Sequence, residues 1–394
     1  MKTKLLSVAA LAALLTACGG GGGSSTPQAQ AQKTDATITA AASATKTTLG
    51  ATELGTSTTQ VYDVAADIGD TWRITFNTVT NAYSIAVLNT VYGLSGSSAG
   101  ATGTYTSSTT GNLTTYTLSG SAGNVSIDSR TKDISGKMTI GGKSSTIMGT
   151  STAVTDLTKL EGVYNFMGAA RNVLGGGSPE ALGGQIKINS DGTATICVDG
   201  TLATGACVAV EATHSAQAVA LELRKTTDSV TGIEKIYLDF VTPQYLNEKT
   251  MGIINIQAGD LGPVLIIDRF GHSPEGTLRT GVFYAIKAQP QPLNASDFDG
   301  TWKCSKYGLD GTTLVVKTSN GSTTNHVTSS DYDATENLVF NKVATSNGTS
   351  QTSINGFAVS VASNGNGVNV LPLSSSLAVV DSDNGSALTT CRKQ

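Results

Sequence analysis

The chain has 394 residues, which is enough for two or three domains, and it carries 25 Lys and Arg against 29 Asp and Glu. A net charge of −4 lacks the basic footprint that phosphate backbones require, so the composition argues against nucleic acid as a partner. Charged residues make up 14% of the chain and hydrophobic residues 39%, with 45 glycines. This composition excludes disorder of the whole chain, because enough apolar material is present for packed cores, and it is typical of an extracytoplasmic all-β protein.

The N-terminus has the layout of an export signal. Lys2 and Lys4 form a positive region before an apolar stretch of eleven residues, Leu5 to Leu15, which is too short to span a bilayer. The motif that follows, Leu15-Thr16-Ala17-Cys18, resembles the lipobox of bacterial lipoproteins. An ordinary secretory signal that is cut after Ala17, with a stray cysteine behind it, is the alternative.

The lipobox resemblance implies that residues 1–17 are a signal peptide and that Cys18 begins the mature chain. In that family the cysteine thiol carries a diacylglyceryl group, and in diderm bacteria the new amino terminus also receives an acyl chain such as palmitate. Gly19 stands where an aspartate, in enteric bacteria, favours inner-membrane retention. The resemblance therefore implies an outer-membrane lipoprotein held by the acyl chains on Cys18. We expect it to face the cell surface in preference to the periplasm.

Residues 18–60 are predicted to form an acylated, disordered tether. A run of five glycines begins at Gly19 and is followed by Ser, Thr and Gln-Ala repeats, a composition that behaves as flexible coil. Only the Ala-rich segment at residues 39–44 favours a transient helix. We expect this tether to lift the remaining chain away from the lipid surface.

The first β-rich segment covers residues 61–156. Its apolar side chains alternate with polar ones, which is the period of a strand with one buried face. A turn over residues 77–81 separates two such runs, which predicts a hairpin. The apolar positions of the hairpin are Trp72, Ile74, Phe76, Tyr83, Ile85 and Val87.

The second segment covers residues 157–288 and holds the most apolar strands that we predict. Its first strand, from Gly162 to Phe166, matches its last strand, from Gly281 to Ile286, in composition. A sheet that closes on itself pairs its first and last strands, so this match favours a barrel or a sandwich. The strands predicted between them cover residues 218–225, 233–241, 250–257 and 264–270.

Residues 289–296 form a predicted linker, because Pro290 and Pro292 cannot donate to a strand ladder. The third segment, residues 297–394, opens with Phe298-Asp299-Gly300-Thr301-Trp302. That opening resembles Leu160-Glu161-Gly162-Val163-Tyr164 and, more loosely, Ile68-Gly69-Asp70-Thr71-Trp72. We interpret the three runs as the recurring first strand of similar β-modules, with a chance echo in a Gly- and Thr-rich chain as the alternative.

The segment from Asn124 to Gly136 is similar to strand-turn-strand pieces of transferrin-binding-protein-like surface lipoproteins. That resemblance implies small β-barrels that bind host proteins or ligands, and it identifies no binding residue. The expected fold class is all-β, with two to three small antiparallel β-barrel or β-sandwich modules behind a flexible N-terminal tether.

Four cysteines remain after Cys18, and four cysteines in an exported protein allow three disulfide pairings. We favour Cys197–Cys207 and Cys304–Cys391, because each pair then lies within one predicted module. A metal site is the alternative, but none of the cysteines has the C-x-x-C spacing and His214 completes no zinc pattern. We therefore expect disulfides and no metal.

Catalytic motifs match only superficially. The run Gly96 to Gly100 fits G-x-S-x-G, but a loop and a strand follow it where a helix is required. The run Gly136 to Ser144 has the wrong spacing for a phosphate loop, and a β-hairpin turn explains it better. We expect no catalytic residue and no cofactor.

One loop concentrates acid, base and imidazole after an apolar strand. It contains Arg269, His272 and Glu275, which we name as candidate ligand-binding residues. A solvated turn with an ordinary ion pair is the alternative.

The sequence favours a non-enzymatic binding or surface-interaction lipoprotein, with a protein or small ligand as its unidentified partner. Its long Thr-, Ser- and Asn-rich loops would present polar contacts on rigid scaffolds. A periplasm-facing structural or assembly lipoprotein is the first alternative, and an extracytoplasmic hydrolase is the second.

Overall fold

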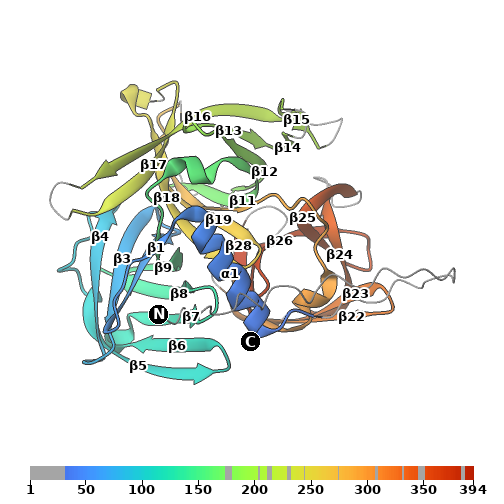
Figure 1. Cartoon of the computed structure of the whole chain (residues 1–394), viewed down its shortest axis with the longest axis horizontal. Helices are drawn as coiled ribbons and strands as arrows, with labels where there is room; N and C mark the ends of the chain where they lie inside the picture. The colour runs from blue at the N-terminus through green and yellow to red at the C-terminus, as the bar shows by residue number, and fades with distance from the viewer. Residues whose placement is uncertain are drawn as a thin grey trace, which may run out of the picture.

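A computed structural model of the chain is shown in Figure 1. Cys18 lies outside the described residues, as do the rest of the lipobox and the predicted signal. The structure describes residues 32–173, 180–202, 205–210, 215–228, 232–243, 245–273, 275–306, 309–330, 332–344, 351–382 and 387–394.

Three closed antiparallel barrels of eight strands each make up the fold. The expected all-β class with barrel modules is confirmed. Barrel 1 is formed, in chain order, by β2 (Thr59–Ala66), β3 (Asp70–Asn77), β4 (Ala82–Asn89), β5 (Thr102–Thr110), β6 (Leu113–Leu118), β7 (Gly123–Asp128), β8 (Asp133–Ile140) and β9 (Lys143–Thr150). The predicted hairpin is the β3–β4 pair, in which Phe76 lies opposite Tyr83.

Barrel 2 closes through its first and last strands, as the matching ends of the segment predict. Phe166 on the first strand pairs with Ala285 on the last. Its strands are β11 (Gly162–Asn172), β12 (Glu180–Ile188), β13 (Thr193–Val198), β16 (Gln217–Thr227), β17 (Glu234–Phe240), β18 (Thr250–Gly259), β19 (Gly262–Arg269) and β20 (Arg279–Lys287).

Barrel 3 is an uninterrupted meander that closes between its first and last strands. Its strands are β21 (Gly300–Lys306), β22 (Leu309–Ser319), β23 (Ser322–Thr328), β24 (Asp333–Ala344), β25 (Gln351–Val361), β26 (Gly367–Ser374), β27 (Leu377–Ser382) and β28 (Ala387–Lys393).

Short elements flank the barrels or lie in the loops between their strands. Two small sheets pair β1 (Thr52–Glu53) with β10 (Thr152–Ala153) and β14 (Gly200–Thr201) with β15 (Val208–Ala209). Four 3₁₀ turns are η1 (Ser119–Ser121), η2 (Leu157–Leu160), η3 (Tyr245–Asn247) and η4 (Ala295–Phe298).

Helix α1 (Asp35–Leu49) corrects the tether prediction. The side chain of Thr34 caps its N-terminus by accepting from the Thr37 amide, and Gly50 ends it in the left-handed region at φ 60°. Ile38, Ala42 and Leu49 are buried, and the helix packs on β18 and β19, crossing in front of the barrels in Figure 1. Capping at both ends and a narrow apolar stripe thus stabilise a helix, although the Ala- and Thr-rich composition suggested flexible coil.

The barrels are also packed against one another. Outward-facing side chains of barrels 2 and 3, with two from barrel 1, form one buried cluster between the sheets. It contains Ala65, Met148, Met167, Val264, Ile266, Val282, Tyr284, Ile286, Phe357, Leu371, Leu373, Leu377 and Val379. The boundaries predicted at residues 156, 288 and 296 imply that the segments between them fold independently. That independence stays a prediction.

Barrels 2 and 3 open in the same way. In barrel 2 the Tyr164 hydroxyl donates to the carbonyl of Leu160 at 2.8 Å, and in barrel 3 the Trp302 indole N–H donates to the carbonyl of Phe298 at 2.9 Å. Each acceptor ends a 3₁₀ turn that precedes the first strand. The repeated motif is therefore a shared structural device in these two barrels.

The pairing of first and last strands that closes barrels 2 and 3 is also the same. Tyr164 lies opposite Lys287 on the last strand of barrel 2, and Trp302 lies opposite Lys393 on the last strand of barrel 3. In barrel 1 the prediction was wrong, because Trp72 lies on the second strand of the barrel, β3. Its indole donates to Asp70, two residues earlier, in place of a carbonyl of a preceding turn.

Candidate functional site: a cavity inside barrel 3

A cavity of about 270 Å³ lies inside barrel 3 and is lined by residues from all eight strands and from η4. Small side chains create it. Ala358 and Ala378 occupy inward positions on β25 and β27 and leave much of the barrel interior unfilled. Proteins fill most interior volume, so a void of this size in a small barrel identifies the candidate site.

The other two barrels fill their interiors with larger groups. In barrel 1 the rings of Phe76 and Tyr116 lie 4.7 Å apart, and in barrel 2 those of Phe166 and Phe283 lie 6.0 Å apart. Barrel 3 instead gathers its aromatic side chains toward one end of the cavity. There Phe298 contacts Trp302 at 6.5 Å and Phe340 at 4.9 Å between ring centroids, which leaves the remaining interior open.

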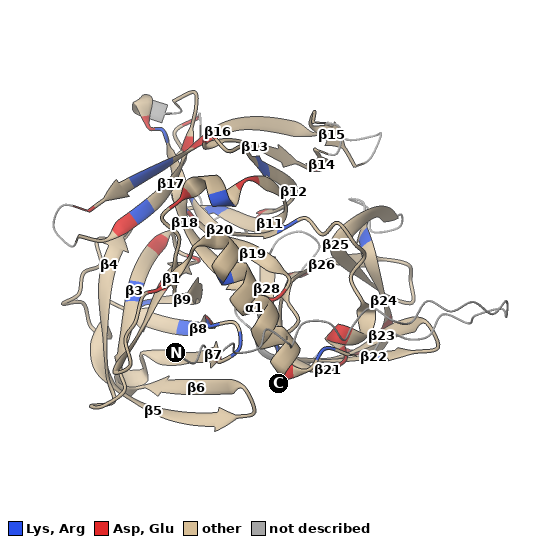
Figure 2. Ribbon diagram, in the orientation of Figure 1, with Lys and Arg blue, Asp and Glu red and all other residues tan. Residues whose placement is uncertain are grey.

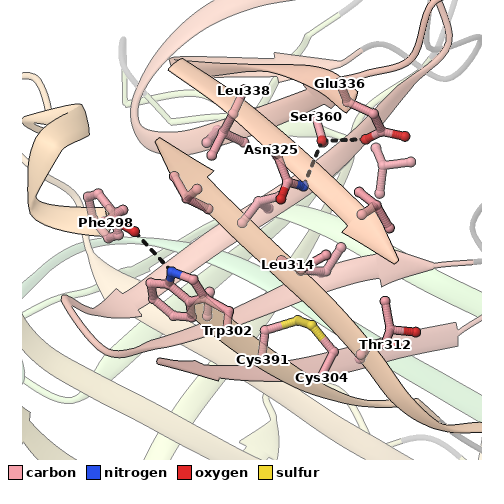
Figure 3. A pocket seen from close by; sticks show the side chains of 18 of the residues that line it. Phe298, Trp302, Cys304, Thr312, Leu314, Asn325, Glu336, Leu338, Ser360 and Cys391 are labelled. Carbon is pink, nitrogen blue, oxygen red and sulfur yellow. Dashed lines mark hydrogen bonds between the residues drawn. A yellow bond between two sulfur atoms is a disulfide. The ribbon is translucent and has the colours of Figure 1, made fainter. Parts of the chain in front are cut away.

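A polar wall faces into the cavity from three neighbouring strands. Asn325 on β23 lies directly opposite Glu336 on β24, and Ser360 comes from β25 (Figure 3). The Asn325 side-chain amide donates to the Ser360 hydroxyl at 3.2 Å, and that hydroxyl donates to a Glu336 carboxylate oxygen at 2.5 Å. The second Glu336 oxygen accepts from the Tyr332 hydroxyl at 2.7 Å.

The Asn325 carbonyl oxygen has no hydrogen-bond partner among the described residues. Asn325 is only 4% exposed, so water cannot reach this oxygen freely. In Figure 3 it points away from Ser360 toward the middle of the cavity. A buried acceptor without a donor costs about 1–3 kcal/mol, so the arrangement calls for a donor from a bound molecule or an ordered water.

Negative charge dominates the cavity lining. Glu336 is the carboxylate of the polar wall, and no Lys, Arg or His occurs among the described lining residues. The hydrogen bond to Glu336 raises the pKa of Tyr332, because it stabilises the protonated phenol. Charged residues are sparse along the barrel strands in general (Figure 2).

The wall opposite the polar residues is apolar and cross-linked. Trp302 and the Cys304–Cys391 disulfide line it, as Figure 3 shows. The disulfide joins β21 to β28 where Cys304 and Cys391 lie directly opposite each other, so it fastens the closure of the barrel. The structure also contains the other favoured pairing, Cys197–Cys207, in barrel 2.

The structure does not bring the predicted loop residues to a common surface. Arg269 ends strand β19 and is 6% exposed, and its guanidinium donates to the carbonyls of Met251 and Gly271 at 3.3 and 2.7 Å. Burial lowers the pKa of Arg269 to about 10. Arg269 thus belongs to the end of a strand and not to the loop, and its guanidinium satisfies backbone carbonyls. Its ligand-binding role stays a prediction.

The other two residues lie nearer the surface. A ring nitrogen of His272 (Nδ1) and the backbone N–H of His272 both lie within hydrogen-bond distance of Glu248, at 2.6 and 3.1 Å. Glu275 is exposed, and a hydrogen bond from Ser273 lowers its pKa. A ligand-binding role for His272 and Glu275 stays a prediction.

Sequence reasoning missed Asn325, Glu336 and Ser360. A signal was present for Glu336 and Ser360, since each lies two residues from an apolar inward residue of its strand, Leu338 and Ala358 respectively. Asn325 shares the inward face of its strand with another polar residue, Thr323. The surrounding sequence is rich in Thr, Ser and Asn on both faces, so these three polar residues do not stand out.

Two further searches concern metals and membranes. Within the described ranges, no group of three or more His, Cys, Asp or Glu is arranged to hold a metal ion. The one α-helix of the described chain, α1, is too short and too polar to cross a bilayer.

Comparisons with known proteins give little similarity. No family model matches the chain, and no curated protein matches it either. Among solved structures, the chain is similar to a double mutant of the vaccine antigen transferrin binding protein B from Haemophilus parasuis. The identity is 11%, the alignment covers 82% of this chain and 65% of that chain, and the TM-score is 0.17. The chain thus spans just under two thirds of the length of that protein, and at this TM-score the likeness carries no argument about function.

Proposed function

We propose that this protein is a lipid-anchored envelope protein that binds a small, partly apolar ligand inside barrel 3. The observation that carries the proposal is the buried Asn325 oxygen, which lacks a donor and faces a cavity of about 270 Å³. Ligand sites are mostly apolar hollows with a few convergent polar groups, and the cavity has this composition.

The polar groups of the cavity are held in fixed positions that suit recognition of a ligand. The Ser360 hydroxyl already donates to Glu336 and accepts from Asn325, so it is held as part of a fixed network. A network whose members orient one another presents its remaining acceptors in a preorganised geometry. This favours binding of the ligand over its chemical conversion.

The anchor proposal rests on the lipobox resemblance of Cys18. The first described residues contact the base of barrel 3, where the Gln32 side chain donates to the Asp299 carbonyl at 3.0 Å and the Lys33 amide donates to Asp297 at 2.9 Å. Residues 19–31 span at most about 45 Å when fully extended. An acylated Cys18 would therefore keep barrel 3 close to the outer membrane.

A change of Cys18→Ser tests the anchor. Acyl chains contribute about 0.8 kcal/mol per buried methylene, so several chains hold a protein firmly in a membrane. We expect the variant to leave the detergent phase, or to accumulate with its signal uncut, in a phase-separation assay. Normal membrane retention and maturation of the variant would contradict the lipoprotein assignment, and protease treatment of intact cells then distinguishes a surface-facing protein from a periplasm-facing one.

A cavity-filling change tests the binding site. Ala358→Leu places three more carbon atoms into the hollow, where space exists for them, so we expect the fold to persist while binding is lost. The measurement is calorimetric titration of 1-octanol into the mature chain, with an expected loss of affinity of at least about tenfold.

Val315→Leu is the matched control for this titration. Val315 is 40% exposed on the outer face of β22, so its enlargement should leave binding unchanged. If Ala358→Leu binds 1-octanol as well as Val315→Leu does, the proposed site is wrong.

A further inference from the structure

We propose that the barrel 3 cavity selects a small amphipathic cation, an apolar body that carries one primary ammonium group, and that the ammonium lies between Asn325 and Glu336. This inference rests on the proposed function, since it names the class of ligand for the same site. It follows from the charge, the hydrogen-bonding capacity and the dimensions of the cavity.

Charge excludes an anionic ligand. A carboxylate or phosphate in the cavity would face Glu336 in a low-dielectric interior, with no Lys, Arg or His among the described lining residues to balance it. A cation meets the opposite situation, because the Glu336 carboxylate attracts it. Hydrogen bonds between an ammonium and a carboxylate are about twice as strong as neutral ones.

Hydrogen-bonding capacity selects a group rich in donors. The Asn325 oxygen can accept two hydrogen bonds and receives none from the described residues, and each Glu336 oxygen receives one and can accept another. An ammonium has three donors and no acceptor, whereas a hydroxyl has a single donor. The ammonium therefore matches a wall that offers mainly acceptors.

The distance between the two acceptor side chains also fits one ammonium. Asn325 and Glu336 lie directly opposite each other on adjacent strands, which places their Cβ atoms about 4.5–5.5 Å apart. An ammonium held between the two strands would therefore lie beside both side chains. Tyr332, which bonds Glu336, is 41% exposed, so this end of the cavity adjoins solvent and an ammonium there keeps part of its hydration.

The apolar part of the cavity sets the size of the ligand. Leu314, Leu338 and Val370 line the space between the polar wall and Trp302. An apolar cavity of about 150 Å³ holds benzene, so 270 Å³ suits a body of roughly ten non-hydrogen atoms. An unbranched or singly ringed amine of that size would fill it.

The test compares three probes with the same eight-carbon chain. Calorimetric titration of the mature chain at neutral pH with octylamine, 1-octanol and octanoate separates head-group charge from chain burial. We expect octylamine to bind at least about tenfold more tightly than 1-octanol, and octanoate to bind most weakly. The preference for octylamine should shrink as salt concentration rises.

Two variants assign the preference to the polar wall. Glu336→Gln keeps the shape and removes the charge, so octylamine affinity should fall to that of 1-octanol while 1-octanol affinity stays within about twofold. Asn325→Leu removes the free acceptor and should weaken octylamine and 1-octanol alike. Circular dichroism of both variants checks that the barrel is intact.

The outcomes separate this inference from the proposed function. If 1-octanol or octanoate binds as tightly as octylamine, and Ala358→Leu still abolishes binding, the cavity is a ligand site but the cationic class is wrong. If Glu336→Gln, folded, keeps the full preference for octylamine, the assignment to this wall is wrong. If none of the three probes binds, both the cationic class and the proposed function are contradicted.

Discussion

At the residue scale, this protein buries a carboxylate without giving both of its oxygens a hydrogen-bond partner. Asp268 is fully buried at the boundary between barrels 1 and 2, where one carboxylate oxygen accepts from the Thr71 hydroxyl at 2.5 Å and the other has no partner among the described residues. Burial raises the pKa of Asp268 well above its usual value, and the nearby Asp70 and Asp67 act in the same direction. The folded state therefore favours the protonated acid.

Asp268→Asn tests this statement. Below about pH 4 both the folded and unfolded wild-type chains hold the proton, and the stabilising contribution is fully present. As the pH rises from there through the raised pKa, the unfolded chain releases the proton first, and the contribution is lost at up to about 1.4 kcal/mol per pH unit. Asn does not titrate, so the stability of the variant relative to wild type should increase with pH.

Urea unfolding of both proteins between about pH 4 and 8 measures the difference. Asp67 and Asp70 titrate in both proteins, so the difference between the two curves reports Asp268 together with its interaction with these two carboxylates. Parallel stability curves would show that the pKa of Asp268 is the same in the folded and unfolded chains.

At the level of elements, the strands were more predictable than the helix. Alternation of side chains such as Trp72, Ile74 and Phe76 identified strand faces, because a barrel interior imposes a strict period of two. The sequence predicted only a transient helix over residues 39–44 in place of helix α1, because only Ile38, Ala42 and Leu49 define its buried stripe, within an Ala- and Thr-rich run. Its stability comes from packing on barrel 2, which local composition does not report.

Leu49→Ala measures how firmly the helix is attached. Leu49 is 1% exposed within the apolar core of barrel 2, so its truncation should lower the free energy of unfolding by about 2–5 kcal/mol. Thr48→Ala is the neighbouring control, since the Thr48 side chain is exposed and bonds only within the helix. Equal stabilities of the two variants would show that residues 35–49 behave as the tether that the sequence suggested.

At the level of the whole molecule, buried polar contacts hold the barrels together. Arg392 at the end of barrel 3 pairs with Asp133 of barrel 1 and donates to Ser135 at 2.8 Å, with both charges almost fully buried. Ser375 of barrel 3 donates to Asp260 of barrel 2 at 2.6 Å. The sequence predicted modules joined by a linker, and it could not report these contacts because their partners lie more than a hundred residues apart.

Arg392→Ala should destabilise the chain by about 3–5 kcal/mol, because it leaves the Asp133 carboxylate buried without its partner. The double variant Arg392→Ala with Asp133→Ala removes both charges and should be less destabilised than the sum of the single changes. Chemical denaturation of the three variants gives the coupling energy. Additive effects would show that the ion pair does not join the barrels.

The candidate site was the least predictable feature. The closing disulfide between Cys304 and Cys391 and the motif around Trp302 were evident in the sequence, and both line the cavity. The cavity itself depends on which inward positions hold small side chains, such as Ala358, once the barrel has closed. That is a property of eight strands together, so no single segment of sequence reveals it.

The central claim is that barrel 3 is a ligand-binding barrel, and a crystal structure of the chain grown with octylamine tests it most directly. We predict electron density for the amine inside barrel 3, with its nitrogen within hydrogen-bond distance of Asn325 and Glu336 and its carbon chain directed toward Trp302. A barrel 3 interior without ligand density, or one closed by repacked side chains, would contradict the claim.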